Sequence, residues 1–136
     1  MRALAKDPSF SLVEIALEHG VEVVTHRGGD KGRWYPARRT ISLRADLPAR
    51  ARQCTLAHEL GHAVLGHDAG PELPRWVVEK QERAADKWAA DLLIDPREYA
   101  ELETIYEGHL GAIASEMGVT VSLLATWRDN LEMRSA

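Results

Sequence analysis

Thr55-Leu56-Ala57-His58-Glu59-Leu60-Gly61-His62 carries the motif H-E-x-x-H in the middle of this 136-residue chain. His58 and His62 are four residues apart, so in a helix of 3.6 residues per turn they project from one face. Two imidazoles so placed can hold one Zn²⁺, and the adjacent Glu59 can act as a general base without binding the metal. Small and apolar neighbours predict a mostly buried helix, where three polar groups need a common partner.

The same stretch carries a glycine where a helix would favour alanine. Gly61 costs about 1 kcal/mol relative to alanine in a helix interior. We therefore expect another backbone to approach the helix closely at this position.

A catalytic zinc site usually has three protein ligands and one open position, and three residues compete for the third place. His67 follows the motif, but on a continued helix it points about 140° away from the second histidine, although Gly66 can end the helix. Glu79 and Glu82 lie together on the next predicted helix. Glu82 has Asp86 one turn later, which can accept the free N–H of a ligating histidine.

Hydrophobic spacing and turn residues predict an α+β fold, with a small antiparallel three-stranded sheet beside a bundle of about five helices. Asp46 is the predicted N-cap of the motif helix. The predicted helices cover 9–19, 48–66, 76–94, 97–117 and 120–133, and the predicted strands 21–24, 34–35 and 40–43. We interpret 1–136 as one domain: 1–46 gives a helix and the sheet, 47–96 the two metal-site helices, and 97–136 the C-terminal helices.

Composition narrows the class of protein. The chain is 45% hydrophobic and 28% charged with a net charge of −4, which is typical of a globular domain and argues against general affinity for nucleic acid. Cys54 is the single cysteine, so we expect a reducing compartment. No apolar run approaches the ~20 residues that cross a bilayer, and the N-terminus lacks a signal-like apolar region. These features predict a cytoplasmic protein without membrane contact.

Two segments of the chain together resemble the ImmA/IrrE family of zinc-dependent metallopeptidases. The first is Thr55–His62, and the second is Glu82-Arg83-Ala84-Ala85-Asp86-Lys87-Trp88-Ala89-Ala90-Asp91-Leu92-Leu93-Ile94-Asp95-Pro96. The upstream segments Gly32–Tyr35 and Arg39–Leu43 are similar to strands of that family, so the resemblance spans about residues 20–130. It implies a gluzincin-like architecture, with His58, His62 and Glu82 as Zn²⁺ ligands and Glu59 as the base. Trp88 replaces the usual phenylalanine, and no departure removes a ligand.

The resemblance also implies a biological role. Members of the family often cleave or inactivate a helix-turn-helix repressor of a phage or mobile element. We therefore expect a zinc-dependent endopeptidase with a protein substrate. An extended segment of that substrate would pair with an edge of the small sheet. The alternative is a metal-stabilised regulatory protein that binds and inactivates a repressor without proteolysis, and that does not need Glu59.

The C-terminal segment raises the question of DNA binding. The spacing from Ala114 to Trp127 matches a helix-turn-helix unit, yet residues 97–136 hold three basic and seven acidic side chains. Because phosphate contacts supply most non-specific DNA affinity, we interpret this segment as helical packing and expect no direct DNA binding.

Tyr35, Tyr99 and Tyr106 are each able to stabilise an oxyanion, and the sequence does not choose among them.

Overall fold

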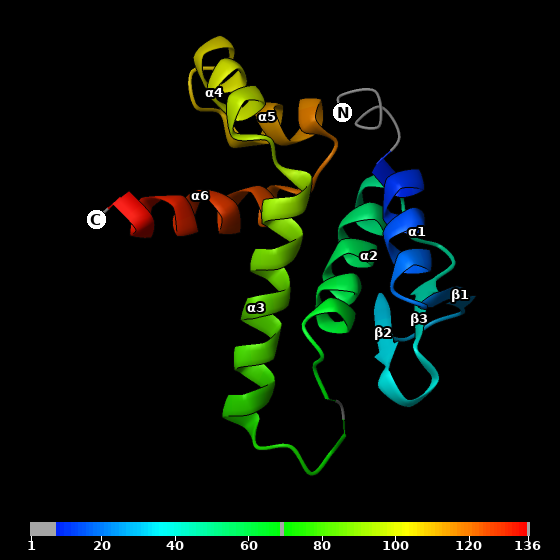
Figure 1. The fold of residues 1–136 in the computed structure, drawn as a ribbon. Coiled ribbons are helices and arrows are strands. Elements are labelled where there is room, and N and C mark those ends of the chain that lie inside the picture. The colour runs from blue at the N-terminus through cyan, green and yellow to red at the C-terminus, as the bar shows by residue number, and fades with distance from the viewer. Residues whose placement is uncertain (1–7, 69, 136) are drawn as a thin grey trace.

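The computed structural model describes residues 8–68 and 70–135, which form six α-helices and a three-stranded sheet (Figure 1). The predicted α+β class is confirmed. In chain order the elements are α1 (Pro8–Glu18), β1 (Glu22–His26), β2 (Gly32–Tyr35), β3 (Thr40–Arg44), α2 (Ala49–Val64), α3 (Arg75–Leu93), α4 (Pro96–Ile105), α5 (Leu110–Met117) and α6 (Val121–Ser135).

The sheet is mixed, so the prediction that all three strands are antiparallel is wrong. The strand order is β1-β3-β2, with β1 parallel and β2 antiparallel to β3. Residues 27–31 carry the chain across the end of β3, a distance of two strand spacings of about 4.8 Å each, which five extended residues can span. A short 3₁₀ turn at Pro36–Arg38 then brings β3 back between the other two strands. This crossing leaves β2 at an edge of the sheet.

Helices α2 and α3 lie side by side and are joined at their lower ends in Figure 1 by the loop that follows α2. Gly61 makes this packing possible. A Cβ added at Gly61 would lie 3.0 Å from the carbonyl oxygen of Ala85 and 3.1 Å from its Cα. The expected close approach of another backbone to Gly61 is confirmed, and that backbone belongs to α3.

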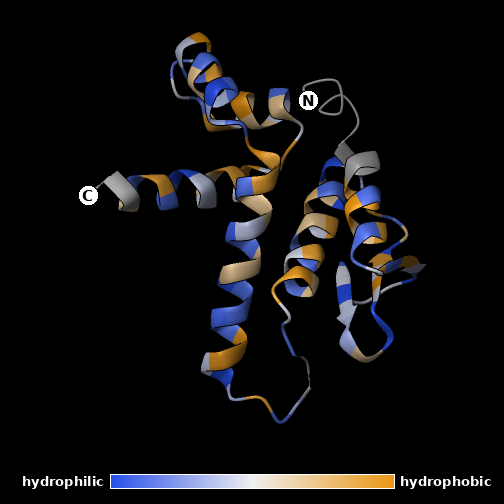
Figure 2. Ribbon diagram, viewed as in Figure 1, coloured by the Kyte–Doolittle hydropathy of each residue, from blue (hydrophilic) through white to orange (hydrophobic). Residues whose placement is uncertain are grey.

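The interior is formed where the sheet and α1 pack on α2. Ile41 and Leu43 of β3 are fully buried together with Leu56 and Leu60 of α2. Hydrophobic residues also gather where the upper end of α3 meets the start of α6, whereas the middle of α3 is largely hydrophilic (Figure 2). The motif helix α2 therefore packs on the sheet and α1 through apolar side chains and lies against α3 on another face.

Two predicted helix boundaries are wrong. Asp46 does not cap α2: the N-cap is Pro48, and the carboxylate of Asp46 accepts a hydrogen bond from Arg44 Nε at 2.6 Å. The helix predicted over 97–117 is two helices, because Glu107 and Gly108 both have positive φ, 51° and 78°, which no α-helix accommodates.

Helices α5 and α6 of the C-terminal segment pack into the interior through apolar side chains. Leu124 and Trp127 of α6 are buried, and Trp127 contacts the ring of Tyr99 at a centroid distance of 4.9 Å. Among the described residues, no single helix is both long and apolar enough to cross a membrane. Only α5 and α6 taken together meet those length and composition criteria, and they are bent by 107° at their junction.

Candidate active site

Helix α2 presents the three polar residues of the H-E-x-x-H motif toward α3 and the sheet. Glu59 and His62 are 7% and 8% exposed, and the His58 side chain is 19% exposed. The two histidine rings pack edge to face with centroids 4.7 Å apart, as their spacing of one helical turn requires. Burial of three polar groups in one small region makes a shared partner necessary.

Glu82 on α3 completes a group that can hold a metal ion. His58, His62 and Glu82 each offer one ligand atom, and these three atoms lie within 4.8 Å of one another. The distances are 3.1 Å between the two histidine Nε2 atoms, 3.2 Å from His58 Nε2 to Glu82 Oε1, and 2.5 Å from His62 Nε2 to Glu82 Oε2.

Two of these three distances fit a tetrahedral zinc ion, whereas the third, 2.5 Å between His62 Nε2 and Glu82 Oε2, is that of a direct hydrogen bond. Ligand atoms about 2.0–2.1 Å from one tetrahedral ion lie about 3.3 Å apart, close to the distances between the two imidazoles and between His58 and Glu82. Two imidazole nitrogens and one carboxylate oxygen are also a donor set that catalytic zinc sites use, with a fourth position left open. The residues present therefore fit Zn²⁺.

Asp86 lies where the sequence predicts it, one turn after Glu82, and it contacts the other ring nitrogen of His58. His58 Nδ1 donates to Asp86 Oδ1 at 2.7 Å, which leaves Nε2 directed at the group of ligand atoms. Burial lowers the pKa of His58, but the hydrogen bonds to Asp86 and Glu82 outweigh it and raise the pKa from 6.5 to about 10. Hydrogen bonds to His58 and, next in importance, to His62 hold the pKa of Glu82 well below its usual range.

Glu59 lies beside the three ligand residues but is absent from the group of possible metal ligands. Burial raises the pKa of Glu59, although the charges of His58 and His62 oppose this effect. A carboxylate with a raised pKa accepts a proton more readily, which suits a general base. The site therefore has two distinct carboxylates: that of Glu82 can bind a metal ion, and that of Glu59 is buried and lies outside the group of ligand atoms.

Gly32 of β2 is a site residue that the sequence reasoning did not single out for this role. A Cβ added at Gly32 would lie 2.6 Å from Thr55 Cγ2 and 2.9 Å from Glu59 Oε2. The edge strand can therefore lie against the carboxylate of Glu59 only because residue 32 has no side chain. The usual signal of such a close approach is an isolated glycine inside a strand, and Gly32 lies two residues before the predicted strand 34–35.

A cleft of about 960 Å³ opens over these residues. All of β2 lines the cleft, together with His58, Glu59, Glu82 and Gln81. Because β2 is an edge strand, its outer backbone groups are free to pair with an extended peptide. The cleft therefore extends from the edge strand β2 to His58, Glu59 and Glu82.

The tertiary structure distinguishes the three tyrosines that the sequence left equivalent. Tyr35 lines the cleft. Tyr99 donates to Glu103 at 2.7 Å and Tyr106 donates to Glu116 at 3.0 Å, and neither of them lines the cleft. Of the three tyrosines, Tyr35 is therefore the one that lines the cleft.

The other third-ligand candidates lie elsewhere. Glu79 pairs with Arg75 on the surface of α3, at 3.0 Å between Oε1 and Nε. His67 contacts His62, but through Nδ1 of both rings at 2.9 Å, so it lies on the side of His62 opposite the Nε2 atom. Cys54, which was not one of these candidates, packs in the hydrophobic core and lines the cleft one turn before His58.

Comparison with known proteins agrees with this geometry. Residues 16–126 match the peptidase M78 family, described as the IrrE N-terminal-like domain. No curated protein sequence matches the chain. The family match covers the sheet, both helices of the polar cluster, and most of the C-terminal helices. The protein therefore belongs to the peptidase M78 family of IrrE N-terminal-like domains, which indicates a function of the metallopeptidase type.

Proposed function

We propose that this protein is a zinc-dependent endopeptidase that hydrolyses a peptide bond in a protein substrate. The observation that carries the proposal is the convergence of ligand atoms from His58, His62 and Glu82 next to the buried, non-ligating Glu59. A metal site that served only for structure would have four protein ligands and no need of a general base. Three ligands, a base and an open cleft together favour hydrolysis.

In the proposed reaction, each residue of the site has a separate role. His58, His62 and Glu82 would hold Zn²⁺, which when bound acts as a Lewis acid that polarises the scissile carbonyl and activates water at neutral pH. Glu59 accepts the proton of the attacking water and returns it to the leaving amine. Asp86 holds the ring of His58 in the orientation that binding requires.

We further propose that the substrate is a helix-turn-helix repressor of a phage or mobile element. The resemblance to the ImmA/IrrE family supports this choice of substrate. An extended segment of the repressor would add to the free edge of β2, with its scissile bond over Glu59. Gly32 suits this arrangement, because the edge strand and the base lie in contact there.

The proposal is tested with the whole purified chain. Zinc content is measured by atomic absorption, and the protein is incubated with repressors encoded near its gene, with and without a chelator. We expect one zinc ion per chain and repressor fragments, seen by mass spectrometry, only in the absence of chelator. An intact repressor after incubation with fully zinc-loaded protein would contradict the proposed activity.

Zinc binding is expected to release protons in a pH-dependent manner. Because the pKa of His58 in the metal-free protein is raised to about 10, this ring still carries a proton at pH 8. A ligating imidazole must be deprotonated at the nitrogen that binds, so binding at pH 8 should release close to one proton, and affinity should rise roughly tenfold per pH unit below pH 10. Calorimetry in phosphate and in Tris measures this release, because the two buffers take up protons with different heats. Equal heats in both buffers would contradict the prediction.

Gly32→Ala is expected to reduce cleavage much more than it reduces zinc binding. The added methyl group overlaps Glu59 Oε2 and Thr55 Cγ2, and the carboxylate must move because the strand backbone cannot. A misplacement of about 1 Å in a catalytic group can cost about 100-fold in rate. Cleavage rate and zinc affinity are measured in parallel, with Gly111→Ala in α5 as a matched substitution away from the cleft. Equal rates for the two alanine variants would show that Gly32 does not constrain the base.

A further inference from the structure

The C-terminus of α2 is a tight turn that folds the chain back onto the motif helix. Gly66 has φ +70°, and its N–H donates to the carbonyl of Ala63 at 3.3 Å. The N–H of His67 donates to the carbonyl of His62 at 3.0 Å. This pair of hydrogen bonds is the Schellman motif, in which the residue after the glycine packs against the residue five positions earlier. Here those two residues are both histidines.

The two histidine rings meet through their Nδ1 atoms, 2.9 Å apart, with centroids 5.1 Å apart and planes at 63°. The opposite nitrogen of His62, Nε2, faces Glu82 and His58. A neutral imidazole has one N–H and one lone pair. When Nδ1–H of His62 donates to His67, the lone pair of Nε2 is free for a cation.

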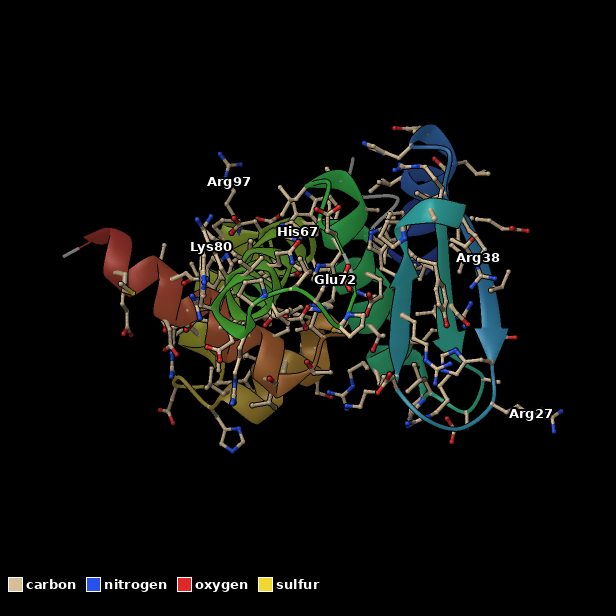
Figure 3. All side chains as sticks on the ribbon, turned by 90° about the horizontal axis from the view of Figure 1, so that it is seen from below. Arg27, Arg38, His67, Glu72, Lys80 and Arg97 are labelled. Atoms are coloured by element: carbon tan, nitrogen blue, oxygen red, sulfur yellow. The ribbon has the colours of Figure 1, made fainter. Side chains whose placement is uncertain are left out.

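His67 is anchored on two sides. Nε1–H of Trp34, from the edge strand β2, donates to the carbonyl of His67 at 3.3 Å. The next residue, Asp68, donates its N–H to Oε1 of Gln81 on α3 at 2.9 Å. Seen from below in Figure 3, His67 lies centrally, whereas Arg27 at the start of the β1–β2 connection extends away from the molecule. The loop after α2 is thus fixed where its histidine meets His62.

We propose that His67 is a positioning residue for His62: it accepts the hydrogen bond of Nδ1–H and thereby selects the tautomer that presents Nε2 to the metal. This inference rests on the proposed function, because it takes Nε2 of His62 as a zinc ligand. His58 is held in the same way by the carboxylate of Asp86. The two ligand histidines are therefore oriented by different groups, one anionic and one neutral.

The test compares zinc affinity, measured by competition with a chelator, across four proteins. His67→Phe keeps a ring but removes the acceptor, and we expect a 10- to 100-fold weaker affinity, the usual effect of losing such a partner. His67→Asn places an amide oxygen where Nδ1 lies, and we expect an affinity within a few-fold of the unmodified protein. His19→Leu is the control, since His19 is exposed on the turn after α1 and its ring bonds to the carbonyl of Ile15, away from the cleft.

A second measurement separates positioning from general support of the fold. Long-range ¹H–¹⁵N correlation spectra of the zinc-loaded protein report which nitrogen of His62 carries the proton. We expect protonated Nδ1 in the unmodified and His67→Asn proteins, and a changed Nδ1 signal in His67→Phe. His67→Leu offers a second side chain without an acceptor if the phenylalanine variant does not fold.

The outcomes distinguish this inference from the proposed function. Equal zinc affinity in the unmodified and His67→Phe proteins overturns the role of His67, whatever the protein cleaves. Failure of His67→Asn to restore affinity also overturns it. Weakened affinity in His67→Phe with rescue by His67→Asn supports it, even if no form of the protein cleaves a repressor, in which case only the endopeptidase proposal fails.

Discussion

Glu59→Gln is expected to lower the rate of peptide cleavage by at least about 100-fold and to leave zinc affinity nearly unchanged. Positioned proton transfer contributes about 10²- to 10⁴-fold to enzymatic rates, and an amide cannot accept the proton of the attacking water. Glu59 is not in the group of possible metal ligands, and glutamine has nearly the same shape. The measurements are cleavage of the repressor and zinc content after gel filtration.

Glu79→Gln is the matched control for this substitution. Glu79 is a glutamate on the surface of α3, paired with Arg75, so its loss should change neither cleavage nor zinc content. Cleavage by the Glu59→Gln protein at the native rate would remove Glu59 from the mechanism. If the Glu59→Gln protein still inactivates the repressor without cutting it, the alternative of a non-proteolytic regulatory protein is supported instead.

His62→Ala is expected to abolish stoichiometric zinc binding, with a loss of affinity greater than about 100-fold. Outer partners of zinc ligands typically contribute 10- to 100-fold to affinity, and a direct ligand should exceed that range. His62 is only 8% exposed and contacts both His58 and Glu82, so its removal also leaves Glu82 without one of its two histidine partners. Zinc content by atomic absorption and the cleavage rate should fall together.

His19→Ala serves as the control for the loss of an imidazole, because that side chain is exposed and lies outside the cleft. Thermal unfolding of the metal-free proteins shows whether His62→Ala has simply disrupted α2. Retention of one tightly bound zinc by a folded His62→Ala protein would contradict the ligand set. Retention of cleavage by that protein would contradict the zinc mechanism as well.

Much of the candidate site could be predicted because the relevant residues lie on single helices. His58 and His62 share a face because they are four residues apart, and Glu82 and Asp86 share a face for the same reason. The structure brings these four residues together. Helical periodicity is a local property, so a sequence shows it without knowledge of the fold.

Two of the errors, the pairing of β1 and the break between α4 and α5, have different causes. The parallel pairing of β1 depends on where residues 27–31 cross the sheet, and strand composition is the same for either direction. The break between α4 and α5 follows from positive φ at Glu107, a residue whose type favours helix. The strand pairing is set by contacts distant in sequence, whereas the helix break has a local signal in Gly108, the next residue, with φ +78°.

The choice among third-ligand candidates divides in the same way. Glu79 and Glu82 are separated by less than one helical turn, and the sequence distinguishes them only through Asp86. In the structure, the approach of α3 to Gly61 turns Glu82 toward the histidines, while Glu79 remains at the surface. His67 faces the opposite nitrogen of His62 because the chain reverses at Gly66.

The amino-acid sequence alone determined the chemical groups of this protein and their grouping on helical faces, since a helix repeats every 3.6 residues wherever it lies. Only the tertiary structure decided which faces meet, which strand forms the open edge, and that Gly32 touches Glu59. The physical reason is that contacts between elements depend on close packing of side chains distant in sequence, where the absence of one methyl group decides whether two backbones can approach.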